Sequence, residues 1–186
     1  MMRIITGKAR GAKLTTLEGM QTRPTSERVK GAIFSSLQFE LEGRHVLDLF
    51  AGSGQLGLEA LSRGAADATF VDASPEAMAV VKENAMRCGF FSQGKYLISD
   101  YRNVIRKEAG QKTYDLIFID PPYERSAAED ALTRILAAGL AAPGALIVTE
   151  TPSPLAPEAF AAELTLRKAA RYSVSHISIW EWEGKK

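Results

Sequence analysis

Residues 46–57 read VLDLFAGSGQLG, and this stretch decides the fold. An apolar strand over 46–50 leads into the motif G-x-G-x-x-G, and the residues over 55–63 have the pattern of a helix. Gly52 and Gly54 allow a tight turn and let a ligand approach the backbone closely. The helix that follows offers free N–H groups at its start. A glycine motif placed between a strand and a helix is typical of α/β folds that bind nucleoside-containing ligands.

Short apolar strands and amphipathic helices alternate along the rest of the chain. Strands are expected at 68–72, 95–99, 114–119 and 145–149, and helices at 25–39, 75–88, 101–108, 126–138 and 155–163. This alternation predicts an α/β fold whose parallel sheet is covered by helices on both faces.

The C-terminal part of the chain has a different pattern. The segments 164–173 and 175–183 both read as strands, and the tight connection between them requires antiparallel pairing. We therefore predict a seven-stranded, mainly parallel sheet that ends in an antiparallel hairpin. In the last strand, we expect one of Trp180 and Trp182 in the core and the other at an edge or on the surface.

The positive charge of the chain is concentrated at its N-terminal end. Residues 1–30 hold seven basic and two acidic residues, a net charge of +5, although the whole chain of 186 residues has a net charge of only +1. A basic end on an acidic body suggests contact with a polyanion, and nucleic acid is the usual candidate. With glycines at Gly7 and Gly11, residues 1–22 are expected to form a basic extension or small β-hairpin ahead of one domain over 23–186.

Two carboxylates accompany the glycine motif. Asp72 ends the second strand, eighteen residues after Gly54, where a carboxylate can accept the hydroxyl hydrogens of a ribose. These features fit either a dinucleotide or S-adenosylmethionine. Asp48 lies four residues before Gly52, where its negative charge suits an amino group and a sulfonium better than a pyrophosphate. Together with the antiparallel ending, Asp48 favours S-adenosylmethionine.

The fourth strand ends in an unusual way, because the apolar run 116–119 is followed by Asp120-Pro121-Pro122-Tyr123. In a doubly wound sheet this end faces the same crevice as the glycine motif. The Asp120 carboxylate and the Pro121 carbonyl can accept the two hydrogens of an amino group on a base, and Tyr123 can stack on that base. A carboxylate there also stabilises the positive charge that the nitrogen gains as it attacks a methyl group. This chemistry needs no metal and no covalent nucleophile.

Several motifs carry a resemblance to a known family. The order DLFAGSG, VDAS, SDYRN and IDPPY resembles class I S-adenosylmethionine-dependent methyltransferases that act on amino nitrogens. More specifically, RIITGKARG (3–11) and TRPTSERV (22–29) are similar to the bacterial 16S rRNA guanine-N2 methyltransferases of RsmD type. The resemblance covers nearly the whole chain. It implies a Rossmann-like methyltransferase with S-adenosyl-L-methionine as its cofactor, and 16S rRNA within the 30S subunit or its precursor as its partner.

The same resemblance assigns roles to individual residues. The implied target-base site is Asp120, Pro121 and Tyr123, and the residues implied to contact RNA phosphates are Arg10, Arg23 and Arg28. The implied cofactor-binding residues are Asp48, Phe50, Ala51, Gly52, Gly54, Asp72, Ala73, Asp100 and Tyr101, with Asp100 at the adenine amino group.

Two other functions are compatible with parts of this pattern. A DNA adenine-N6 methyltransferase shares the DPPY motif, but such enzymes usually carry a separate target-recognition domain. A non-catalytic RNA-binding or ribosome assembly factor could keep a cofactor pocket, although Asp120 and Tyr123 argue against it. No apolar run reaches the length of a membrane span and no signal-peptide pattern is evident, so we expect a cytoplasmic monomer.

Overall fold

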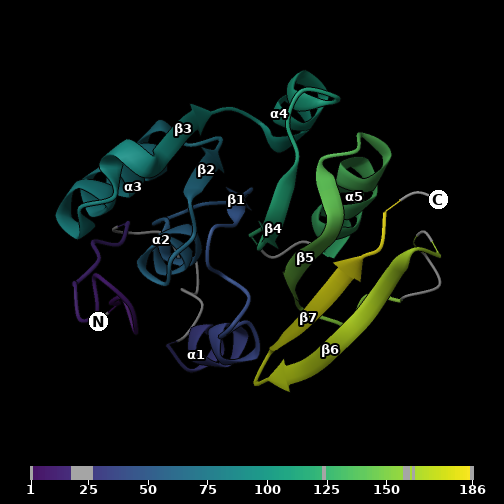
Figure 1. Ribbon diagram of the computed structural model, residues 1–186, viewed down its shortest axis with the longest axis horizontal. Coiled ribbons are helices and arrows are strands. Elements are labelled where there is room, and N and C mark those ends of the chain that lie inside the picture. The colour runs from purple at the N-terminus through teal and green to yellow at the C-terminus, as the bar shows by residue number, and fades with distance from the viewer. Residues whose placement is uncertain (1, 18–26, 123–124, 157–159, 161, 185–186) are drawn as a thin grey trace.

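One sheet of seven strands runs through the molecule (Figure 1). The computed structural model describes residues 2–17, 27–122, 125–156, 160 and 162–184. The strands are β1 (His45–Asp48), β2 (Asp67–Asp72), β3 (Gly94–Ile98), β4 (Tyr114–Ile119), β5 (Ala141–Thr151), β6 (Leu164–Tyr172) and β7 (Ser175–Trp182). Their order in the sheet is β3-β2-β1-β4-β5-β7-β6. β1 to β5 pair in parallel, whereas β7 is antiparallel to both β5 and β6. The predicted sheet and its antiparallel ending are confirmed.

Among the described residues, five α-helices and one short 3-10 helix accompany these strands; the first helix precedes β1 and the others lie between strands. They are α1 (Glu27–Ser36), α2 (Gln55–Ser62), α3 (Pro75–Cys88), α4 (Tyr101–Glu108), α5 (Arg125–Ala137) and the 3-10 helix η1 (Phe91–Gln93). The predicted helix over 155–163 falls partly outside the described residues, and the described residues 155, 156, 160, 162 and 163 are not helical. Among the described residues, no helix is long and apolar enough to cross a membrane.

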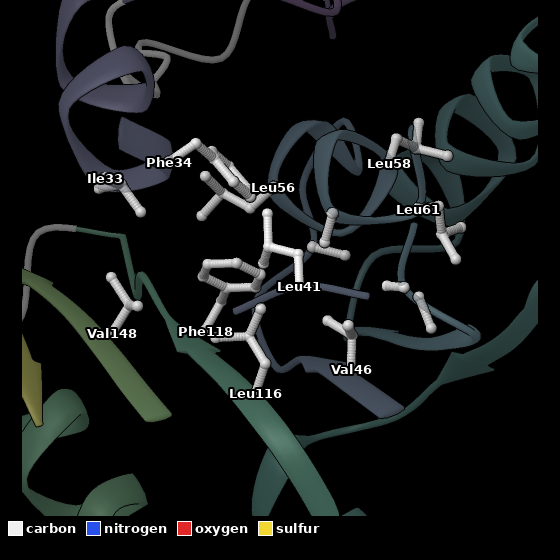
Figure 2. Packing of buried hydrophobic residues seen from close by; sticks show 14 of the residues in the cluster. Ile33, Phe34, Leu41, Val46, Leu56, Leu58, Leu61, Leu116, Phe118 and Val148 are labelled. Atoms are coloured by element: carbon white, nitrogen blue, oxygen red, sulfur yellow. The ribbon is translucent and has the colours of Figure 1, made fainter. Parts of the chain in front are cut away.

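The helices cover both faces of the sheet, and the side chains of β4 pack alternately against the helices on each face. Its residues Leu116 and Phe118 pack in a cluster with α1, α2 and α3, as Figure 2 shows for part of that cluster. The alternating residues Ile117 and Ile119 pack in a second cluster with α4 and α5. Because neighbouring side chains on a strand point to opposite faces, a continuous apolar run is what a strand buried on both sides requires.

Both tryptophans of β7 are buried. Trp180 and Trp182 belong to the same cluster, on the α4 and α5 side of the sheet. The expectation that only one of them lies in the core is therefore wrong. Residues two apart on a strand share a face, so two tryptophans in alternation are buried together. The indole N–H of Trp180 donates to Thr149 Oγ1 at 3.2 Å, which satisfies its polar group.

The N-terminal residues form an antiparallel turn that packs on the domain. Arg3 pairs with Lys13, and the Ile4 N–H donates to the Ala12 carbonyl at 2.9 Å. Ile4 is fully buried in the cluster with α1, α2 and α3. We call residues 2–14 the N-terminal hairpin. The predicted boundary between residues 22 and 23 falls outside the described residues and stays a prediction.

A buried carboxylate attaches the N-terminal hairpin to α2. Glu59 Oε2 accepts the Ile5 N–H at 2.8 Å, and Oε1 accepts the Thr6 N–H at 3.0 Å. Glu59 also pairs with Arg63 at 2.9 Å and with Lys30 of α1 at 3.4 Å, and the side chains of Glu59 and Lys30 are both 0% exposed. Lys30 in turn donates to the Arg3 carbonyl at 2.5 Å. The hairpin, α1 and α2 therefore meet at one ionic cluster.

We predict that Glu59→Gln lowers the free energy of unfolding by about 3 kcal/mol, because it leaves Lys30 buried without its counter-charge. The new amide would also present N–H donors to the backbone N–H groups of the hairpin. Urea denaturation followed by circular dichroism measures the change. Glu83→Gln is the matched control, because Glu83 forms an exposed pair with Arg87 that is worth less than about 1 kcal/mol. Equal losses in the two variants would contradict the structural role of Glu59.

Candidate functional site

The carboxyl ends of β1, β2 and β4 meet at one edge of the sheet. Beyond the end of β1, the Leu49 N–H donates to the Phe118 carbonyl of β4 at 3.1 Å. Two residues later, the Ala51 N–H donates to the Val71 carbonyl of β2 at 2.9 Å. The loop after β1 is thus held between its two neighbours at the edge where doubly wound folds bind ligands.

Asp72 fixes the glycine loop. Its Oδ2 accepts the Gly52 N–H at 2.9 Å, and its Oδ1 accepts the Ser74 N–H at 2.9 Å. Each carboxylate oxygen keeps a second lone pair for a ligand hydroxyl. Gly52 has a φ of +55°, and a Cβ at this position would have open space around it. A ligand can therefore approach this backbone, as the motif predicts. Next to Asp72, Ala73 is exposed, whereas Ala51 is buried below the loop.

The first turn of α2 is tightly packed. Gly54 is the N-cap residue of the helix and has a φ of +76°, which favours glycine. One turn later, a Cβ on Gly57 would collide with the Phe70 ring. The Gly57 N–H donates to Asp48 Oδ2 at 3.0 Å. The three glycines of the motif therefore serve three different purposes: open backbone, tight turn and close helix–sheet packing.

Asp48 lies beneath this turn and is only 2% exposed. Burial raises the pKa of its carboxyl to about 7, the Gly57 hydrogen bond opposes this shift, and the charge of Asp72 adds to it. A carboxyl group with this pKa changes its charge near neutral pH. Its position below the helix start gives it an electrostatic influence on the crevice, and its hydrogen bond supports the loop.

The loop after β3 supplies an accessible acid and a buried aromatic residue. Asp100 is exposed and caps α4 by accepting the Arg102 N–H at 2.9 Å. Tyr101 is buried, its ring centroid is 5.0 Å from that of Phe50, and its hydroxyl donates to Asp130 at 2.7 Å. The exposed side chain of Asp100 is thus accessible to a ligand. The buried ring of Tyr101 packs against the half-buried ring of Phe50.

The DPPY segment lies at the end of β4. Asp120 is half-buried, Pro121 is buried and Pro122 is exposed. Tyr123 lies outside the described residues, so its predicted stacking role stays a prediction. Asp120 follows Ile119 directly, and β4 is the immediate neighbour of β1 in the sheet. The acid and the glycine loop are therefore brought to the same edge.

Two of the three predicted RNA-contacting residues are described, and both are exposed. Arg10 is exposed on the hairpin turn and Arg28 is exposed on the first turn of α1, whereas Arg23 falls outside the described residues. Neither Arg10 nor Arg28 forms an ion pair with another described residue. A groove of about 340 Å³ separates the hairpin from α1, and Arg3, Arg10 and Glu27 are among the residues that line it.

Two features of the site were missed at the level of sequence. No motif singles out Glu59, although it is the only charged residue in the run 54–62, which is otherwise small or apolar with one amide. A lone charge inside such a run is the signal that a buried partner exists. Gln55 is the first residue of α2 and is only 7% exposed, although the glycine motif accepts any residue at this position.

Comparison with known proteins shows the family to which the chain belongs. The family model described as Conserved hypothetical protein 95 matches residues 2–181. The chain belongs to this family. Ribosomal RNA small subunit methyltransferase D of Haemophilus influenzae is 35% identical over 152 residues, which are 81% of this chain and 78% of that protein. The enzyme of the same name from Escherichia coli K12 is 33% identical over 150 residues, 81% of this chain and 74% of that protein. The family inferred from the sequence is confirmed.

Solved structures agree with the family assignment. The Escherichia coli protein yhhF superposes with a TM-score of 0.87 and 29% identity, and the alignment covers 99% of each chain. An RNA methyltransferase from Salinibacter ruber, solved with S-adenosyl-L-homocysteine, has a TM-score of 0.68 and 13% identity over 88% of this chain and 95% of that one. At that identity the second likeness concerns the fold alone. The predicted class I methyltransferase fold is confirmed.

We predict that the stability of this family member falls as pH rises through the range from about 4 to 7. The Asp48 carboxyl titrates near 3.9 in the unfolded chain and near 7 in the folded chain, so the folded state holds its proton more tightly. Asp48→Asn keeps an acceptor for the Gly57 N–H but does not titrate. Relative to this variant, the wild type should lose up to about 1.4 kcal/mol per pH unit. Urea denaturation from pH 5 to pH 8 tests this, and parallel profiles would refute it.

Proposed function

We propose that this chain transfers a methyl group from S-adenosyl-L-methionine to the exocyclic N2 amine of a guanine in 16S rRNA, acting as a monomer on the 30S subunit or its precursor. The observation that carries the proposal is the position of Asp120. This acid lies at the carboxyl end of β4, next to the glycine loop of β1, on a chain whose relatives are named ribosomal RNA small subunit methyltransferase D. A DNA adenine methyltransferase is not favoured, since no observation supports it over rRNA.

The residues at the edge of the sheet fit the cofactor. Gly52 leaves open space beside its backbone, and the carboxylate of Asp72 has lone pairs left to accept ribose hydroxyls. Exposed Asp100 would accept the adenine amino group, Ala51, Ala73 and Gly54 would shape the cofactor site, and Phe50 would form part of its wall. The bound cofactor supplies a methyl group activated by a sulfonium. Asp48 adds negative potential below the methionine part of the pocket.

The residues at the end of β4 would hold the target amine. The Asp120 carboxylate and the Pro121 carbonyl each accept one hydrogen of the N2 group, which orients its nitrogen toward the methyl group. As positive charge develops on this nitrogen, the Asp120 carboxylate stabilises it. Tyr123 stacks on the base. Most of the rate enhancement then comes from positioning and from this fixed negative charge.

Exposed cations near the N-terminal hairpin would contact the RNA backbone. Arg10 lines the groove between the hairpin and α1, and Arg28 is exposed on the first turn of α1; neither forms an ion pair with another described residue. Arg23 is proposed to join them. These contacts with phosphates position the substrate, whereas the crevice selects the base.

A methyl-transfer assay tests the function directly. Labelled S-adenosylmethionine is offered together with 30S particles from a strain that lacks the enzyme, and with total RNA and DNA in parallel. The proposal requires label in N2-methylguanosine of small-subunit rRNA. Label in DNA adenine would overturn it. Cofactor binding without any transfer would instead indicate an assembly factor.

We predict that Asp120→Ala lowers the rate of transfer by about 100-fold to 1000-fold, which is the usual effect of removing one group that stabilises developing charge. The dissociation constant for the cofactor, measured by calorimetry, should stay within about twofold of the wild-type value. Full activity of this variant would show that the amine site is assigned to the wrong residues.

We also predict that Arg10→Ala and Arg28→Ala weaken particle binding and each reduce its salt dependence by about one unit of the log–log slope. Filter binding between 50 and 200 mM salt measures this slope. Arg106→Ala on α4 is the matched control, because Arg106 is exposed on the opposite face of the sheet. An unchanged slope in the first two variants would remove the hairpin surface from the RNA interface.

A further inference from the structure

The turn of the C-terminal β-hairpin lies at the same edge of the sheet as the crevice. β5 runs two residues past its last pairing with β4 and ends at Thr151, which lies beside His176 of β7. His176 in turn pairs with Arg171 of β6, and the chain reverses immediately beyond this pair at Tyr172–Ser175. We call Tyr172–Ser175 the β6–β7 turn. The strand register therefore places this turn at the carboxyl ends of β4 and β5.

The order of the strands places the β6–β7 turn on the substrate side of the crevice. The groups proposed to hold the cofactor belong to β1, β2, β3 and the loops that follow them, whereas β5, β7 and β6 lie on the other side of β4. Neighbouring strands are about 4.8 Å apart, so β6 lies three strand spacings, or about 14 Å, from β4. An RNA whose base enters at Asp120 thus has neighbouring nucleotides within reach of the turn.

An exposed arginine accompanies the β6–β7 turn. The Nε–H of Arg171 donates to the Ser173 carbonyl at 3.1 Å, which holds the guanidinium at the turn. Arg171 forms no ion pair with another described residue. By contrast, Arg167 of the same strand pairs with Glu40 at 2.9 Å and with Glu181 at 3.5 Å. The charge of Arg171 is therefore left for a ligand, and a guanidinium suits a phosphate group.

The backbone of the β6–β7 turn is unusual. Ser173 has a φ of +57° and is the only residue other than glycine with a positive φ in the part of the chain that the structure describes. Glycine is the residue that usually takes such a position in a two-residue hairpin loop. The next residue, Val174, is 56% exposed. The turn thus keeps two side chains, one of them apolar, at a place where glycine would be less strained, and such outliers are frequent at ligand-binding positions.

The hairpin formed by β6 and β7 also packs beside α1. Lys168 Nζ donates to Ser36 Oγ at 2.7 Å, and Figure 1 shows the β6–β7 turn next to this helix. Lys168, like Arg171, is exposed and forms no ion pair with another described residue. Arg28, on the first turn of α1, has the same properties. α1 and β6 therefore present three exposed cations without carboxylate partners among the described residues.

We propose that the β6–β7 turn binds the RNA backbone next to the target base, with Arg171 donating to a phosphate and Val174 contacting the adjacent nucleotide. This inference rests on the proposed methyl transfer to RNA and adds to it an RNA contact separate from the N-terminal hairpin. Contacts with phosphates fix the register and orientation of a nucleic acid. The turn would therefore help to set which nucleotide of the bound RNA reaches Asp120.

The variant Arg171→Gln tests the phosphate contact. It should reduce the salt dependence of binding to 30S particles by about one unit of the log–log slope. The KM for particles should rise by about tenfold, the usual effect of losing one charged hydrogen bond, while kcat and the dissociation constant for the cofactor stay unchanged. Arg167→Gln is the matched control, because Arg167 lies on the same strand but is already paired with Glu40. The control should keep the wild-type slope and KM.

A photochemical cross-link tests the position of the β6–β7 turn independently of charge. Val174 is replaced by the photoreactive residue p-benzoylphenylalanine, and irradiation in the presence of 30S particles should cross-link this position to 16S rRNA. The same residue at Gln111 should give no such cross-link, because Gln111 is exposed between α4 and β4, at the opposite end of β4.

Two results would overturn the inference while leaving the proposed function intact. One is a wild-type salt slope and KM in Arg171→Gln. The other is a cross-link from position 174 to ribosomal proteins alone, or no cross-link at all. Absence of methyl transfer by the wild-type protein would instead refute the proposed function, on which the inference rests.

Discussion

The hydrogen bonds and ion pairs of the Glu59 carboxylate fix the N-terminal hairpin relative to the crevice, and the rest of the site depends on them. It accepts two backbone N–H groups of the N-terminal hairpin, and it pairs with Lys30 and Arg63 without any exposure to solvent. Burial lowers the pKa of Lys30, and the adjacent Glu59 opposes that shift. A buried charge is tolerated only when its partners are fixed, so this cluster holds the hairpin in one position. The N-terminal hairpin, which carries Arg10, is therefore attached directly to α2, the helix that follows the glycine loop.

A second constraint is imposed by the sheet itself. β1 and β4 are buried on both faces, so their residues alternate between two apolar clusters and leave only the strand ends for polar chemistry. Asp48 is the exception, because it is an acid inside this buried layer. Its raised pKa and the unpaired oxygen of Gln55 both reduce stability. Groups that reduce stability are expected at a binding site, where the free protein must already hold them in position for the ligand.

Most of the architecture could be predicted from the sequence because it follows from periodicity. Alternating apolar strands and amphipathic helices determined the parallel sheet, and the glycine motif located the crevice. The errors have physical causes as well. A helix was expected over 155–163, where the described residues are not helical. Only one of Trp180 and Trp182 was expected in the core, although residues two apart on a strand share a face and both are buried. Glu59 was missed because its hairpin and α1 partners are distant in sequence, and Gln55 was missed because only the packed structure reveals its burial.

The fixed hairpin also bears on the kind of RNA that suits this protein. A segment that folds only on binding can adapt to many shapes, but it loses conformational entropy when it does so. The described hairpin is already attached to α1 and α2, so it brings Arg10 to the substrate at a set distance from the crevice. The hairpin contact with phosphates and the crevice contact with the base are set at one distance. They therefore bind best to a substrate whose own phosphates and target base are fixed in space. An RNA held within a folded particle meets this requirement better than a flexible strand, which favours the proposed 30S substrate over naked RNA.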